Sequence, residues 1–400
     1  MDQQRFSPGR PETGGAGGSD WPRIIVAYVA GVVAAFGLGK ISAVGAQLSD
    51  ALGLTLSQLG WLISVITGIC AAVGLAGGVL NRRYGTGRML VAGLAVVTVS
   101  SALSVAATGF GTLLAARLVE GLGYLLVTVA CPVLIARLAS DRDRAIALSI
   151  WGTFVPVGIG LSTLVGGLVG TGAGWRVWLG VVAAVTLVCT LVTWRRLPSG
   201  RSAEHSGVPT RPGALVRPVL LAFAFCLIAM ATLSVVVLLP AFLTERYGQP
   251  ASAAGALTSV ISLISVAGGI VAAGLLRRTV APSVLALSGV VIVPAAWLAF
   301  REESSVTTTA IGAGVISFEN GILVAIVFAT LPHVLVSLTH MDLGNGIVAQ
   351  LGSLGSMLGP PFFGLLAERG GWPALVPIIS AAVVAGVALM IWTLARVGAG

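Results

Sequence analysis

The sequence predicts an all-α membrane protein, with twelve transmembrane helices in two six-helix halves and both termini in the cytoplasm. The first observation is composition, because 56% of the 400 residues are hydrophobic and only 9% are charged, whereas about 25% of residues in soluble proteins are charged. Together with a mean hydropathy of +1.00, this excludes a soluble enzyme, a nucleic-acid-binding protein and a disordered protein. The other two observations are the regular spacing of apolar segments and one long polar stretch near the middle of the chain.

The apolar segments justify the number of helices. A helix needs about 20 apolar residues to cross a hydrocarbon core of about 30 Å, and charges, prolines, glycines or turn residues separate twelve such segments. Six lie in the first half of the chain, at 24–46, 58–80, 89–109, 112–134, 145–170 and 175–194. Six more lie in the second half, at 218–243, 253–276, 284–300, 306–331, 344–367 and 374–395.

Polar stretches divide the chain into four parts. Residues 1–22 are rich in Gly and Pro and lack the apolar core of a signal peptide, so they are predicted to be a disordered cytoplasmic tail. The longest internal polar stretch, 195–217, is predicted to be a cytoplasmic linker. It would join an N-terminal six-helix half at 23–194 to a C-terminal six-helix half at 218–400.

An internal repeat supports this division. The runs GLAGGVLNRRYG and GIVAAGLLRRTV are similar, and they place Arg82 and Arg277 195 residues apart. VGIGLSTLVGG in the fifth segment also matches LGSMLGPPFFG in the eleventh. Two repeated six-helix halves with termini on the same side predict parallel repeats about an axis along the membrane normal, with a substrate site between them near the midplane.

Basic residues predict the orientation. With cytoplasmic termini, 17 of the 23 Lys and Arg residues fall in cytoplasmic segments, 4 fall on the outer side, and Lys40 and Arg117 lie within apolar segments. This excess follows the positive-inside rule and predicts a multi-pass protein of the inner (cytoplasmic) membrane. The rule also accounts for the sequence pI of about 10.4, so no nucleic-acid partner is expected.

The cysteines and histidines predict no metal site and no cofactor. The four cysteines each lie in an apolar run without a Cys-x-x-Cys spacing, which favours buried packing. The three histidines lie far apart in the sequence. The only lysine stands in Gly-Lys-Ile rather than in the Gly-Lys-Ser/Thr of a P-loop, so ATP-driven pumping by this chain is excluded. No HExxH or GxSxG motif is present, and no enzymatic activity is expected.

Four local patterns together resemble the major facilitator superfamily of secondary transporters. They are GGVLNRRYGTGR at 77–88, RLVEGLGY at 117–124, GWRVW at 174–178 and the Gly-Pro-rich eleventh segment. The resemblance covers essentially the whole chain after residue 22. It implies an alternating-access carrier in which two halves rock about a central site.

The resemblance also implies gating residues. The first pattern places Asn81, Arg82 and Arg88 at a gate between helices 2 and 3, and Pro360 is a candidate hinge in helix 11. The family usually has Asp at position 81. Asn81 weakens a charge-relay role at this gate, although Asn can still cap a helix end.

Weaker sequence similarities suggest the branch of the family. FGLGKISAVGAQL and WGTFVPVG look most like the cyanate and 2-nitroimidazole transporter-like branch, in which helix 1 usually has Arg at the position of Lys40. Drug/proton antiporters have a Gly-Pro-x-x-Gly-Gly pattern in helix 5, where this chain has STLVGG at 162–167. This difference argues mildly against a drug antiporter.

Four ionisable residues lie within the predicted spans: Lys40, Arg117, Glu120 and Glu319. A charge at the bilayer centre costs about 2.5 to 3.5 kcal/mol on insertion scales, so retained charges are usually paired, cavity-facing and functional. In the family that the chain resembles, helices 1, 4, 7 and 10 line most of the central cavity. All four charges lie on three of these helices.

Two interpretations of these charges remain open. In the functional one, the cations attract an anionic or strongly dipolar substrate and the acids carry a coupling proton. In the structural one, the four residues form buried ion pairs, and Arg117 and Glu120 neutralise each other because they lie three residues apart on one helical face. The substrate-binding candidates are Lys40, Arg117, Tyr124 and Asn320, and the proton-coupling candidates are Glu319 and Glu120. Weaker candidates for substrate contact are Ser234, Thr232, Gln350, Trp151 and again Asn320.

The sequence therefore predicts a secondary active transporter that moves a small polar or anionic solute and is coupled to protons. The alternative within the same class is a proton-coupled multidrug efflux antiporter. Two alternatives outside secondary transport are a channel and a non-transporting sensor with this fold. The expected partners are a small-molecule substrate and the lipid bilayer, and a monomer is expected.

Overall fold

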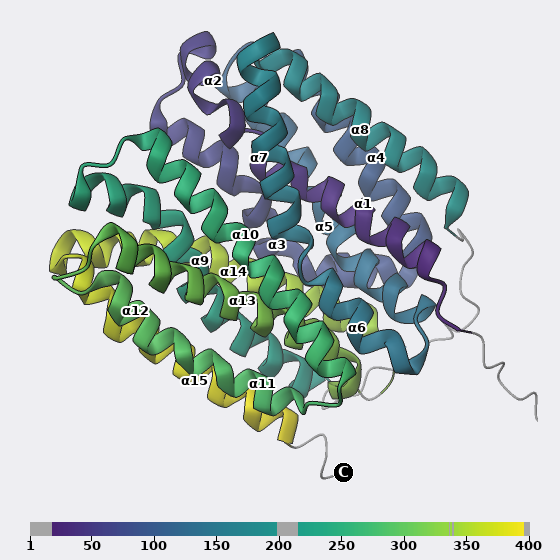
Figure 1. Cartoon of the computed structure of the whole chain (residues 1–400). Coiled ribbons are helices and arrows are strands. Elements are labelled where there is room, and N and C mark those ends of the chain that lie inside the picture. Colours follow the sequence, from purple (N-terminus) through teal and green to yellow (C-terminus); the bar gives the residue numbers. More distant parts are fainter. Residues whose placement is uncertain (1–17, 198–214, 336, 338–339, 396–400) are drawn as a thin grey trace, which may run out of the picture.

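The computed structural model describes residues 18–197, 215–335, 337 and 340–395, which form a bundle of long helices (Figure 1). The helices of the N-terminal half are α1 (Trp21–Gly39), α2 (Gly45–Leu52), α3 (Leu56–Tyr84), α4 (Thr86–Val105), α5 (Phe110–Leu138), α6 (Asp141–Trp151), α7 (Phe154–Ala173) and α8 (Trp175–Arg196). Those of the C-terminal half are α9 (Val216–Tyr247), α10 (Ala251–Arg277), α11 (Pro282–Ser288), α12 (Ile292–Phe300), α13 (Val306–Val334), α14 (Met341–Gly370) and α15 (Leu375–Ala395). Short 3-10 turns are η1 (Ser42–Val44), η3 (Gly289–Val291) and η5 (Trp372–Ala374).

The predicted all-α membrane fold is confirmed. Eleven spans among the described residues are long and apolar enough to cross a membrane, and α14, with 30 residues, is the twelfth long segment. Most of the predicted tail at 1–22 and of the linker at 195–217 lies outside the described residues, although α1 already begins at Trp21. Figure 1 shows the start of α1 and the end of α15 on the same side of the bundle, which we call the terminus side.

The first predicted span, 24–46, was wrong as one continuous helix. α1 ends at Gly39, and the chain continues through η1 into α2. The carbonyl oxygen of Lys40 accepts a hydrogen bond from the indole Nε1 of Trp178 at 3.0 Å. The N–H of Val44 turns back to the carbonyl of Ile41 instead, so the helix is interrupted where the backbone of Lys40 bonds a neighbouring helix.

Two other predicted spans are divided near prolines. The segment 145–170 becomes α6 and α7, and Pro156 lies in the first turn of α7. Because Pro has no N–H, it cannot donate to the carbonyl four residues earlier, which here belongs to Gly152 at the break. In the segment 284–300, Pro294 follows the turn η3 that separates α11 from α12.

The two halves meet closely where α3 packs against α14. Glycines on both helices let the backbones approach. An added Cβ on Gly346 would lie 2.9 Å from the carbonyl oxygen of Gly74, and one on Gly74 would lie 2.6 Å from the Cβ of Gln350. The second contact between halves joins α6 to α10 and α13.

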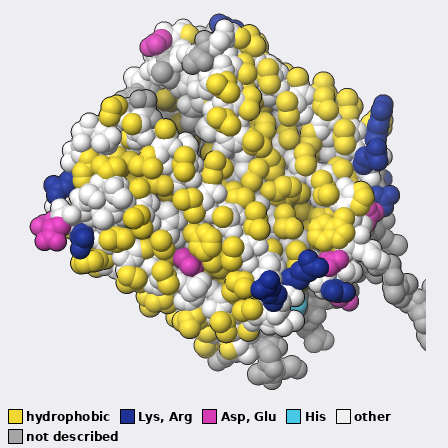
Figure 2. All heavy atoms as spheres, viewed as in Figure 1, with side chains coloured by type: hydrophobic (Ala, Val, Ile, Leu, Met, Phe, Trp, Pro, Cys, Tyr) yellow, Lys and Arg dark blue, Asp and Glu magenta, His cyan; other side chains and the backbone are white. Residues whose placement is uncertain are grey.

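The surface agrees with a bilayer-embedded bundle. Figure 2 shows hydrophobic side chains covering most of the visible face, with basic groups gathered at the edge on the terminus side. Large exposed apolar side chains include Ile270 on α10, Leu287 on α11 and Trp297 on α12. Extensive exposed apolar surface marks a face that contacts a membrane or another protein, and the length and hydropathy of the spans favour a membrane.

Candidate functional site

Three of the four predicted membrane charges lie together in one cluster. Lys40 follows α1, while Arg117 and Glu120 lie one turn apart on α5, so the end of one helix faces the side of another. The Nζ of Lys40 lies 2.8 Å from Oε1 of Glu120, and the Nη1 of Arg117 lies 2.8 Å from Oε2. The predicted pairing of Arg117 with Glu120 is confirmed. We call these three residues the N-half cluster.

Every partner of the N-half cluster comes from the N-terminal half. Lys40 also donates to the hydroxyl of Ser101 on α4 at 2.9 Å, and the Nε of Arg117 donates to the carbonyl of Leu62 on α3 at 2.8 Å. All three charged side chains have no exposed surface. The cluster therefore lies inside the N-terminal bundle, between α1, α3, α4 and α5, rather than at the junction of the two halves.

The N-half cluster carries an excess of positive charge. Two cations face one carboxylate, and the Nη2 of Arg117 has no hydrogen-bond partner among the described residues. At an effective dielectric constant well below that of water, an uncompensated charge acts over a longer range than it would at the surface. With Lys40, Arg117 and Glu120 all ionised, the buried cluster carries one net positive charge.

A second buried charge group joins the two halves on the terminus side. Asp342, in the first turn of α14, accepts hydrogen bonds from the Nδ2 of Asn81 at the end of α3 and from the Nη2 of Arg137 at the end of α5, the latter at 3.3 Å. Arg137 also donates to the hydroxyl of Thr86 at 3.2 Å. Asp342 has no exposed surface, and the positive end of the α14 dipole favours its charge. We call Asn81, Arg137 and Asp342 the clasp.

Sequence reasoning found one member of the clasp and missed the other two. Asn81 was predicted as a gate residue from its motif, whereas Asp342 and Arg137 were not among the predicted site residues. The available signal was an acid in HMDLGNG, two residues before a predicted span, where a helix N-terminus attracts negative charge. Of the other predicted gate residues, Arg82 is half-buried and Arg88 is exposed.

The contact between α3 and α14 includes a break in α3. Val73 has non-helical angles, φ −129° and ψ 21°. The Oε1 of Gln350 on α14 accepts from the N–H of Leu75 at 3.0 Å, and its Nε2 donates to the carbonyl of Ala72 at 3.4 Å. The side-chain amide of Gln350 thus pairs with backbone groups that the break exposes. This break in α3 lies in a segment without proline, and Pro360, the predicted hinge, lies inside α14.

One face of α13 points toward the N-terminal half. Residues Asn320, Val324 and Phe328 recur every four positions and so share a helical face. The ring of Phe328 meets that of Trp151 edge-on, with centroids 6.4 Å apart, and Trp151 stacks on Phe154 at 4.1 Å. Trp151 is fully buried, and its indole Nε1 has no hydrogen-bond partner among the described residues.

Polar groups continue along this face away from the terminus side. The amide Oδ1 of Asn320 accepts from the hydroxyl of Thr232 on α9 at 2.8 Å. In the N-terminal half, the hydroxyls of Tyr28 and Thr153 lie 2.8 Å apart. Polar residues of both halves thus lie close to the aromatic group at Trp151, because an added Cβ on Gly152 would lie 3.2 Å from Cγ1 of Val324 on this face of α13.

The remaining candidates lie apart from this face. Glu319 is next to Asn320 in the chain, but its Oε2 accepts from the hydroxyl of Ser288 at the end of α11, at 2.8 Å. Its partner thus belongs to its own half. Tyr124 is buried on α5, one turn beyond Glu120 and within the main hydrophobic core. The four cysteines are buried, as predicted.

A bundle of two six-helix halves that meet through α3 and α14 and through α6, α10 and α13 is typical of membrane transporters. A family model described as Major Facilitator Superfamily matches residues 27–343. The chain belongs to this family.

Individual proteins agree with this assignment. The chain is 29% identical over 374 residues to the 3-(3-hydroxy-phenyl)propionate transporter of Escherichia coli, covering 86% of this chain and 87% of that protein. It is 28% identical over 154 residues to the methylenomycin A resistance protein of Bacillus subtilis, covering 38% and 33%. Among solved structures, the fucose:proton symporter of E. coli superimposes with a TM-score of 0.77 at 14% identity, covering 94% of this chain and 98% of that chain. A human organic anion transporter gives 0.76 at 16% identity, covering 93% and 99%.

Proposed function

We propose that the protein is an alternating-access secondary transporter that moves a small organic anion across the cytoplasmic membrane as a monomer and is coupled to protons. The observation that carries the proposal is the unbalanced positive charge of the N-half cluster. Lys40 and Arg117 are both buried against a single carboxylate, and an anion that enters the bundle lowers the cost of this excess. A relative that is 29% identical over most of both chains is named for a substrate with a carboxylate.

The substrate is proposed to bind between the halves, on the far side of the aromatic group at Trp151. Asn320 and Thr232 supply polar groups from the C-terminal half, and the free indole N–H of Trp151 supplies a buried donor from the N-terminal half. An apolar wall with a few convergent polar groups suits an organic anion that combines a ring or chain with a carboxylate. Lys40, Arg117 and Tyr124 act on this site from within the N-terminal bundle.

Proton coupling is proposed to involve Glu319, with Glu120 as a second candidate. Glu319 is the acid of the membrane region that has no basic partner among the described residues, and its carboxylate accepts a hydrogen bond from the Ser288 hydroxyl. A carboxyl group held by one hydroxyl can gain or lose a proton without breaking an ion pair. Glu120, by contrast, is held by two cations, which favour its charged form.

The decisive test of the substrate class is Lys40→Ala in proteoliposomes, with labelled 3-(3-hydroxyphenyl)propionate as the probe and arabinose as a neutral comparison. Removal of Lys40 leaves Arg117 and Glu120 as a balanced pair, so we expect normal folding but loss of anion uptake. Lys40→Arg keeps the charge and is the matched control, for which we expect partial activity. Normal anion uptake by Lys40→Ala would remove Lys40 from the mechanism.

The coupling proposal has its own test. In Glu319→Gln we expect a pH gradient to stop driving accumulation, while exchange of internal for external substrate continues. Glu303→Gln, which removes an exposed acid elsewhere in the C-terminal half, is the control. Accumulation by Glu319→Gln under the same gradient would show that Glu319 is not the proton carrier.

The second candidate function is proton-coupled efflux of hydrophobic drugs. Its specific support is the partial match to a protein named for methylenomycin A resistance. This function predicts that overexpression raises resistance to such compounds and that Lys40→Ala leaves the resistance unchanged. The anion proposal predicts instead that Lys40→Ala loses transport.

A further inference from the structure

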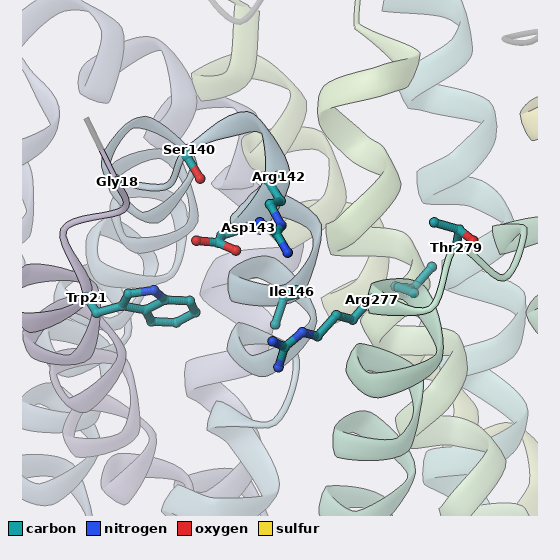
Figure 3. A pocket seen from close by; sticks show the side chains of 9 residues that line it. Gly18, Trp21, Ser140, Arg142, Asp143, Ile146, Arg277 and Thr279 are labelled. Carbon is teal, nitrogen blue, oxygen red and sulfur yellow. The ribbon is translucent and has the colours of Figure 1, made fainter. Parts of the chain in front are cut away.

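A cavity of about 970 Å³ opens on the terminus side between the two halves. Its lining comes from the start of α1, the start of α6 and the end of α10, with Trp21, Arg142 and Arg277 as the largest side chains. Figure 3 shows Arg142 and Arg277 extending from α6 and α10 into the space between these helices, with Trp21 on the other side of α6. The cavity is separate from the N-half cluster, the clasp and the proposed substrate site.

The charge of this cavity favours an anion. Both arginines are exposed, and no ion pair of either one occurs among the described residues. The acid that lines the cavity, Asp143, is bonded to the hydroxyl of Ser19 at 2.7 Å. Two guanidinium groups against one acid leave a net positive charge, and guanidinium forks suit the oxygen atoms of a phosphate.

The surroundings favour a lipid as the source of that phosphate. Trp21 stands at the end of a span, where Trp side chains mark the interface of a membrane, and the cavity wall also includes the apolar side chains of Ile146 and Leu276. Exposed apolar residues continue from the cavity into the membrane region, at Ile25 on α1 and Ile270 on α10. Figure 2 shows basic groups at the same edge of the apolar face.

We propose that this cavity binds the phosphate headgroup of an anionic membrane phospholipid, with its acyl chains along the apolar surfaces of α1 and α10. Basic pockets between membrane helices are suited to such headgroups. Arg142 belongs to the N-terminal half and Arg277 to the C-terminal half, so the bound lipid bridges the halves. A ligand that binds one state better shifts the population toward it, and this lipid therefore stabilises the state closed on the terminus side. Only this last step rests on the proposed alternating-access function.

Binding is tested on the full chain in detergent by native mass spectrometry, with dioleoyl-phosphatidylglycerol and dioleoyl-phosphatidylcholine as probes. We expect retained phosphatidylglycerol, at least tenfold weaker retention in Arg142→Gln/Arg277→Gln, and intermediate retention in each single variant. Arg195→Gln/Arg278→Gln removes two exposed arginines that do not line the cavity and is expected to match the parent. Equal retention of both lipids by the parent, or unchanged retention by the cavity double variant, overturns the proposal.

Two further measurements separate the possible sources of phosphate and guard against a folding defect. Inorganic phosphate at 10 mM is expected to leave lipid retention unchanged, whereas displacement of the lipid by inorganic phosphate assigns the site to a soluble anion and overturns the lipid proposal. A photo-crosslinking phosphatidylglycerol on the unsubstituted protein is expected to label the terminus-side ends of α6 and α10. Labelling confined to other helices contradicts the site.

The conformational effect is tested in nanodiscs with spin labels at Arg83→Cys and Ala395→Cys, one in each half on the terminus side. Phosphatidylglycerol is expected to increase the short-distance population relative to phosphatidylcholine, and Arg142→Gln/Arg277→Gln is expected to abolish the increase. If the lipid binds without any change of distance, the stabilising effect is refuted but the lipid site is not. Failure of the conformational step is therefore distinct from failure of the binding proposal.

Discussion

The N-half cluster and the clasp are two buried charge groups that differ in the helices they join. In the N-half cluster, Lys40, Arg117 and Glu120 belong to one six-helix half. In the clasp, Asp342 of the C-terminal half is held by Asn81 and Arg137 of the N-terminal half. A rocking motion of two rigid halves can leave the first group intact, but it must separate the second. Burial alone therefore does not distinguish a charge that holds a bundle together from one that closes a gate.

The largest expected effect is that of Glu120→Gln on stability. This change leaves Lys40 and Arg117 buried without a counter-charge, and breaking a buried ion pair in this way costs about 3 to 5 kcal/mol. We expect little folded protein and a large loss of thermal stability, measured by fluorescence-detected size-exclusion chromatography after heating.

The controls for Glu120→Gln sharpen the comparison. Lys40→Met/Glu120→Gln removes one of the two cations and is expected to recover part of the lost stability. Glu302→Gln, at an exposed position, should have no effect. A melting curve of Glu120→Gln equal to that of the parent would mean that the N-half cluster does not hold the N-terminal bundle together.

A smaller effect is expected from Asp342→Asn in the clasp, and it concerns the balance between closed and open states rather than folding stability. Hydrogen bonds to charged groups contribute about 1.5 to 3 kcal/mol, which corresponds to a roughly tenfold or larger change in the balance between closed and open states. We expect a nearly normal melting curve but a longer distance between labels at Arg83→Cys and Ala395→Cys.

The exchange of the two clasp residues provides the control. Asn81→Asp alone places a second carboxylate against Asp342, and we expect it to open the terminus side as well. Asn81→Asp/Asp342→Asn restores one acid and one amide and should recover the closed distance. If the double variant is as open as either single variant, the pairing of positions 81 and 342 does not close the gate.

The smallest expected effect is that of Gln350→Leu at the break in α3. Two neutral hydrogen bonds are lost, each contributing about 0.5 to 1.5 kcal/mol, so we expect a few-fold shift toward the open state with little change in melting temperature. Ser356→Ala on the same helix removes a hydroxyl that bonds only the carbonyl of Gly352 within α14, and it should leave the distance unchanged. An equal shift in both variants would assign the effect to α14 itself.

The sequence predicted the helical spans better than their continuity. Hydropathy located each segment, but it gave no sign that the backbone of Lys40 bonds Trp178 or that α3 breaks at Val73. The break before Pro156 has a local cause, because proline lacks an N–H. A break without proline depends on a partner from a distant segment, here Gln350 of α14.

The candidate site shows the same limit. Spacing alone predicted the pair Arg117–Glu120, since residues three apart share a helical face, and the structure confirms it. The structural interpretation included Lys40 among the buried ion pairs, but the sequence did not identify Glu120 as its partner. The bond of Asn81 to Asp342 was not predicted, because it brings together residues from different helices. The placement of Glu319 toward Ser288 likewise depends on the rotation of α13.

The sequence by itself determined that this protein lives in a membrane, that it is built from twelve spans in two related halves, and that few charges enter those spans. These properties follow from the composition of the chain and from the spacing of its apolar segments, and neither depends on how the segments pack. Only the tertiary structure decided which charges meet, which half each cluster belongs to, and where the two halves close. The reason is that a side chain pairs across helices only after packing has set each helix's rotation and depth, and no local pattern encodes those two quantities.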